Sequence, residues 1–113
     1  MNAMETIAAR EPGASIYEAL TRLLGSVGEH AIEVKKTSLH ITRGRAFLGV
    51  HPRASGLLVN IVLDSKLSDA RVVKSEQVSR NRWHNEVLLT SPADVDAQFR
   101  GWITDAYALA GPA

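Results

Sequence analysis

The sequence predicts an α+β fold, with an antiparallel sheet of about five strands and an N-terminal and a C-terminal helix packed on one of its faces. One amphipathic helical stripe lies near each end of the chain, and segment 31–90 between them shows strand-like alternation. The length of 113 residues fits a single domain and leaves no room for two. The expected element order is therefore α-β-β-β-β-β-α.

The N-terminal segment 1–13 shows no apolar periodicity and ends in a Pro-Gly pair, so a mobile tail is expected there, followed by one domain over 14–110. Ser15 followed by Glu18 has the spacing of a capping box, which predicts the start of the first helix. Five apolar residues then follow at helical spacing: Ile16, Leu20, Leu23, Leu24 and Val27.

The first strand region changes phase, because Ile32 and Val34 alternate in one register and Leu39 and Ile41 in the other. A bulge or break at 35–37 would reconcile the two registers. Arg43-Gly44-Arg45 predicts a hairpin turn, and residues 52–56 predict a second turn.

The second strand region begins with the continuous apolar run 57–63, which is typical of a central strand. A loop is expected over 64–69, and two further strands over 72–78 and 83–89. Ser91, Pro92 and Asp94 together form a helix start signal. The stripe of the last helix consists of Val95, Phe99, Trp102, Ile103, Ala106 and Ala110.

Composition and motifs exclude several classes of chemistry. The absence of cysteine excludes disulfides, thiolate nucleophiles and Cys-based metal centres. The sequence lacks the phosphate-binding loop motifs GxGxxG and GxxxxGK[ST], and it lacks the serine-nucleophile motif GxSxG. No cofactor is therefore expected, and no catalytic residue can be named. The four histidines have no HxH or HxxxH spacing, so no metal site is expected. No apolar run is long enough for a membrane span or a signal peptide, which predicts a soluble, cytoplasmic protein.

Charge is distributed unevenly along the chain. Segment 35–84 carries ten Lys or Arg against three acids, whereas the rest carries three against nine. A basic middle predicts a surface that attracts anions, although strand faces exposed to solvent would give the same composition. Arg80-Asn81-Arg82 forms a second arginine-bearing turn, and it precedes Trp83. We interpret Trp83 as core; the alternative is that it stacks on a ligand ring or base beside the arginines.

Several runs of the chain resemble a bacterial uncharacterised family, the domain of unknown function numbered 5655. The resemblance covers about residues 30–109, including Ala46-Phe47-Leu48-Gly49-Val50-His51-Pro52-Arg53 and Glu76 to Val87. It implies no reaction, cofactor or catalytic residue. The polar positions within the matching runs are Lys36, Thr37, His40, His51, Arg53, Asn81, Arg82, His84 and Glu86. The basic strands and capped last helix also resemble, at fold level, the double-wing (YjbR-like) domains.

The leading hypothesis is a non-catalytic binding module whose basic sheet face receives an anionic small molecule or the acidic surface of a protein partner. Nucleic-acid binding by the same surface is one alternative, and an enzyme with an unrecognised His/Arg site is another. A monomer and a homodimer both remain open. The candidate anion-binding residues are Lys36, His40, Arg43, Arg45, His51, Arg53, Arg80, Arg82 and His84.

Overall fold

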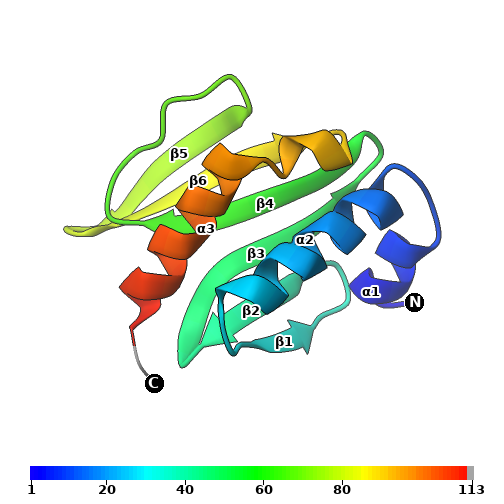
Figure 1. Cartoon of the computed structure of the whole chain (residues 1–113), viewed down its shortest axis with the longest axis horizontal. Coiled ribbons are helices and arrows are strands. Elements are labelled where there is room, and N and C mark those ends of the chain that lie inside the picture. Colours follow the sequence, from blue (N-terminus) through cyan, green and yellow to red (C-terminus); the bar gives the residue numbers. More distant parts are fainter. Residues whose placement is uncertain (112–113) are drawn as a thin grey trace.

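A six-stranded antiparallel sheet with its helices on one face forms the protein (Figure 1). The computed structural model describes residues 1–111. The helical elements are α1 (Ala3–Ala8), α2 (Gly13–Val27), the 3-10 turn η1 (Pro92–Asp94) and α3 (Ala97–Ala110). The strands are β1 (Ala31–Val34), β2 (Leu39–Arg43), β3 (Arg45–Arg53), β4 (Gly56–Leu63), β5 (Val72–Ser79) and β6 (Arg82–Leu89). Their order in the sheet is β1-β2-β3-β4-β6-β5, which confirms the predicted α+β class.

Strand β4 separates the two faces of the sheet. Leu57, Val59 and Ile61 are fully buried, whereas the residues that alternate with them, Leu58, Asn60 and Val62, are half-buried. The buried set belongs to the same core cluster as the apolar residues of α2 and α3, and the alternation along the strand places the half-buried set on the opposite face. Both helices lie on one face of the sheet (Figure 1). The apolar run is therefore a central strand, as predicted. We call the face without helices the open face.

The core lies between the helices and the covered face of the sheet. Helix α2 contributes Ile16, Leu20, Leu23 and Leu24, and helix α3 contributes Phe99, Trp102, Ile103 and Ala106. These are the apolar stripes that the sequence predicts, and their burial supplies the main driving force for packing the helices on the sheet.

The sixth strand comes from a segment expected to be one broken strand. Residues 35–38 form a turn, closed by the Lys35 N–H donating to Ser38 O at 2.8 Å, and β1 pairs with β2 as a hairpin. The phase change at 35–37 is thus a chain reversal. A bulge occurs instead where β2 pairs with β3, at Ile41 and Thr42.

The N-terminal segment differs from the mobile tail that the sequence predicts. Residues 3–8 form helix α1, in which Ala3 and Ile7 are buried in the core. Asn2 and Glu5 make a reciprocal capping box at its start. Six residues are too few for a periodic apolar pattern, which is why sequence periodicity did not reveal this helix.

Both long helices begin differently from their predicted caps. Helix α2 starts at Gly13, and Ser15 donates from its backbone N–H and its hydroxyl to the Glu11 carboxylate at 2.8 and 2.7 Å. Both hydrogen bonds lower the pKa of Glu11, and the bond from the Ser15 hydroxyl has the larger effect. Ser91 caps only the short turn η1, and α3 begins after Asp96, whose carboxylate accepts from the Phe99 N–H at 2.8 Å.

Arg71 fastens the loop after β4 to the start of α3. Its guanidinium donates to the Asp69 carboxylate at 2.9 Å and to the Asp94 carbonyl at 2.7 Å, and lies 4.8 Å from the centre of the Trp102 ring. It also donates to Gln98 Oε1 at 2.8 Å. Side-chain and backbone hydrogen bonds from Arg71 lower the pKa of Asp69.

None of the helices in residues 1–111 has the length and apolar content that a membrane span requires.

Replacing Phe99 with alanine should lower the free energy of unfolding by about 3–5 kcal/mol, because it leaves a cavity in the core. Phe99 is 0% exposed and packs edge-on against Trp102. Chemical denaturation monitored by circular dichroism measures the change. Thr104→Ala on the exposed side of the same helix is the matched control and should change stability by less than about 1 kcal/mol. Equal effects of the two variants would contradict the assignment of Phe99 to the buried side of α3 and of Thr104 to its exposed side.

Candidate functional site

Three of the four histidines meet on the open face. His40 on β2 lies opposite Gly49 on β3, and His84 on β6 lies opposite Val62 on β4. With His51 they line a hollow of about 320 Å³. The residues that line this histidine hollow are His40, Ala46, Leu48, Gly49, His51, Asn60, Val62 and His84. Strand register brings the imidazoles together from three separate strands.

Gly49 and Asn60 form the floor of the hollow. They are direct partners across β3 and β4. A Cβ on Gly49 would lie 3.5 Å from Nε2 of His51 and 3.6 Å from Cβ of Asn60, so the His51 ring lies over the glycine. A larger side chain at this position would fill the space between the imidazoles. The missing side chain therefore creates the hollow.

The Asn60 amide is only partly satisfied. Its Nδ2 donates to Nδ1 of His84 at 3.3 Å, which places the proton of a neutral His84 ring on Nε2. Its Oδ1 is buried and has no hydrogen-bond partner. Leaving a buried acceptor unpaired costs about 1–3 kcal/mol. An acceptor of this kind marks a position where a ligand's donor would be stabilised.

Burial lowers the pKa of His51, and the positive charges of Arg53 and His40 lower it further, against an opposing effect of the Glu86 carboxylate. The His51 ring is therefore neutral at pH 7. In that state it offers one N–H donor and one nitrogen acceptor to a ligand.

The open face is mixed in charge. Glu33 is the cross-strand partner of His40, Glu76 of His84, and Glu86 of Asn60. Two of these acids, Glu33 and Glu86, lie outside the basic segment 35–84 in the sequence but fold back beside it. Counting charge along the chain cannot reveal this, because register decides which residues share a face.

The remaining candidate residues do not join the hollow. Arg43 lies 4.1 Å from the centre of the Tyr107 ring and donates to the Tyr107 carbonyl at 3.0 Å, so it stabilises the end of α3 on the covered side. The other cations outside the lining are Lys36, Arg45, Arg53, Arg80 and Arg82. Among these, Arg53 is the one whose charge acts on His51. The fourth histidine, His30, lies beside Gly28, with 2.9 Å between Nδ1 and the glycine carbonyl.

The interpretation of Trp83 as a core residue is wrong. It is only half-buried, beside the β5–β6 turn, whereas Trp102 is 9% exposed and belongs to the core. A position next to a hairpin turn, at the end of the sheet, explains the partial exposure.

Sequence reasoning did not single out the two floor residues. Asn60 is the one polar residue in the run 57–63, and that interruption was the available signal. Gly49 lies within a strand, where glycine often marks a close approach of ligand or backbone. Both signals gain meaning only once the register places the histidines around them.

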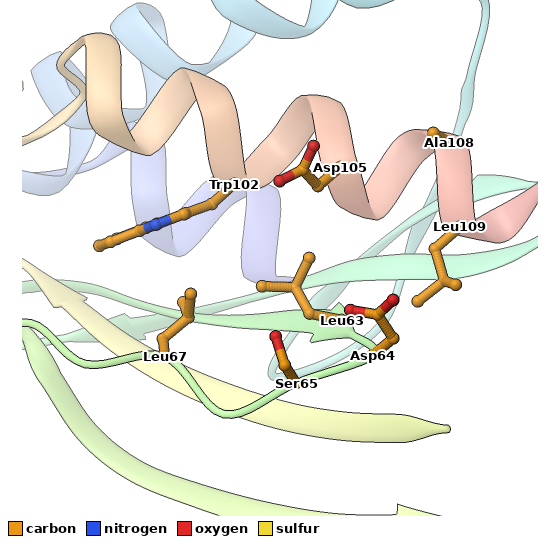
Figure 2. Close-up of a pocket in the computed structure, with 8 residues that line it drawn as sticks. All are labelled: Leu63, Asp64, Ser65, Leu67, Trp102, Asp105, Ala108 and Leu109. Atoms are coloured by element: carbon orange, nitrogen blue, oxygen red, sulfur yellow. The ribbon is translucent and has the colours of Figure 1, made fainter. Parts of the chain in front are cut away.

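A second cavity, of about 440 Å³, lies between α3 and the segment after β4 (Figure 2). Trp102 and Leu67 contribute apolar surface, and the carboxylates of Asp64 and Asp105 lie on opposite sides (Figure 2). Asn85 fixes the segment after β4 that lines one side of this cavity. Its buried amide accepts from the Leu67 N–H at 3.0 Å and donates to the Ser65 carbonyl at 3.1 Å. Two acids and no cation line this cavity, so it does not suit an anion. The lining consists of Leu63, Asp64, Ser65, Leu67, Trp102, Asp105, Ala108 and Leu109.

Within residues 1–111, no three His, Asp or Glu side chains are arranged to hold a metal ion.

In an NMR pH titration of the imidazole protons, His51 should titrate below the ordinary value of about 6.5. Glu86→Gln should lower that pKa further, because the carboxylate stabilises the protonated ring; Arg53→Gln should raise it. A His51 pKa at or above the ordinary value, or no response to both substitutions, would contradict this description of the hollow.

The comparisons with known proteins agree with the resemblance in the sequence. No significant match is found among curated proteins or among solved structures, and the likeness to double-wing domains stays a prediction. The model of one family, described as a domain of unknown function (DUF5655), matches residues 4–110. The match includes most of α1, both long helices and all six strands, and hence every residue of the histidine hollow. The chain therefore belongs to the DUF5655 family.

Proposed function

We propose that this protein is a non-catalytic binding module whose histidine hollow holds one anionic group, such as the carboxylate or phosphate of a small molecule or of an acidic protein partner. The observation that carries the proposal is the convergence of His40, His51 and His84 from three strands on one hollow. Imidazole N–H groups donate hydrogen bonds to oxyanions, and they gain a positive charge when protonated.

The geometry favours one small group over an extended polyanion. The Cα partners of His40, His84 and Asn60 on the neighbouring strands are acids, namely Glu33, Glu76 and Glu86. A nucleic-acid backbone that crossed the open face would meet these carboxylates, and like charges disfavour such a contact. A ligand confined to about 320 Å³ meets mainly the imidazoles and the floor.

The proposal also fixes the direction of the pH dependence. Because burial lowers the pKa of His51 and keeps its ring neutral at pH 7, this ring becomes positively charged only as the pH falls. Anion affinity should therefore rise as the pH falls, and binding an anion should in turn raise the pKa of His51.

Sulfate is a suitable probe because its charge is constant over the pH range in which histidine titrates. Added sulfate should shift the ring resonances of His40, His51 and His84 and leave that of His30 unchanged. Its affinity should increase roughly tenfold between about pH 8 and pH 5.5, as neutral hydrogen bonds become charge-assisted.

Gly49→Val should abolish the sulfate response, since the added methyl groups occupy the hollow while every imidazole is retained. Valine suits a strand, and thermal unfolding checks that the fold survives. His30→Gln is the matched control that removes one imidazole outside the hollow. Equal shifts at all four histidines, or an unaltered response in Gly49→Val, would refute the proposal.

If labelled DNA or RNA binds with a salt slope of several units and displaces sulfate, the anionic group belongs to a nucleic acid.

A further inference from the structure

The strands around the histidine hollow carry an acid on one side and basic residues on the other, and the acid, Glu86, is not one of the residues that line the hollow. Asn60 Oδ1 is a buried acceptor without a partner, and Glu86 is the direct cross-strand neighbour of Asn60 on β6. On the other side, His40 and His51 lie on β2 and β3, and Arg53 follows on β3. A simple anion would satisfy the imidazoles but would leave Oδ1 unpaired, and it would bind next to the strand that carries Glu86.

We infer that the ligand of the hollow is a small zwitterion, an acid that also carries an ammonium group, as an amino acid does. Its carboxylate would accept from the imidazoles of β2 and β3, and its ammonium would donate to Asn60 Oδ1 and pair with Glu86. The inference rests on the proposed function, because it assigns the acidic group of the ligand to the same imidazoles.

Two physical features support a ligand of this class. The charge of Glu86 reaches across β4 to the His51 ring, where it opposes the lowering of the pKa by burial. Strands β3 and β6 both pair with β4, so the basic and the acidic residues flank Asn60 on the two sides of one strand. The floor acceptor is an amide oxygen, which accepts from an ammonium without bringing a charge of its own into a half-buried site.

The test compares four small probes by NMR titration of the full chain: glycine, acetate, methylammonium and glycolate. Glycine should bind about tenfold more tightly than acetate or methylammonium, because only glycine satisfies both sides at once. Its binding should shift the side-chain amide resonances of Asn60 together with the ring resonances of His40 and His51.

Glu86→Gln should reduce glycine affinity about tenfold, to the level of acetate, and should not weaken acetate binding. Glu76→Gln is the matched control, since Glu76 is another acid on the open face but lies opposite His84 and beside Lys74, with 3.6 Å between Nζ and Oε2. It should leave both affinities unchanged. If Glu86→Gln alters thermal unfolding, the comparison of glycine with acetate in the unaltered chain decides alone.

The outcomes separate the two proposals. Equal binding of glycine and acetate would overturn the zwitterion and leave the anion site standing. Glycolate binding as tightly as glycine, with no effect of Glu86→Gln, would also overturn it, because a neutral donor to Asn60 would then suffice. Absence of any ring shift with sulfate, acetate and glycine would overturn both.

Discussion

The structure depends on the two-residue alternation of the central strand β4. Val59 and Ile61 pack under the helices, and their burial supplies hydrophobic stabilisation. Because side chains alternate along a strand, Asn60 and Val62 then lie on the opposite face. A slip of one residue would bury Asn60 in the core and expose the apolar set, so the register is strongly specified. The same constraint that builds the core therefore positions the floor of the hollow.

The pairing register also fixes the positions of residues on the strands next to β4. Gly49 is held opposite Asn60, and His40 opposite Gly49, by backbone pairing across three strands. Helices α2 and α3 lie on the other face of the sheet (Figure 1), so they do not cover these positions. The rigidity of a paired sheet suits a binding site, because ligand groups meet donors that are already placed.

Sequence patterns predicted the class, the facing of the long helices and five strand regions, because each depends on local periodicity. They failed where partners are distant in the chain. The loop before β5 is fixed by Arg71 and Asn85, whose partners lie on other segments, and the N-terminal helix α1 is too short for a periodic pattern. Six of the nine site candidates lie at or beside turns, namely Lys36, Arg43, Arg45, Arg53, Arg80 and Arg82. Asn60 and Gly49 at the floor could be recognised only from register.

The most direct test of a shared histidine site is a crystal structure grown in selenate, a sulfate analogue that anomalous scattering locates without bias. We expect a selenium peak over Gly49 that places selenate oxygens within hydrogen-bond distance of His51 and of at least one of His40 and His84. Peaks confined to exposed arginines such as Arg45 and Arg80, with the hollow empty at the same selenate concentration, would contradict the site.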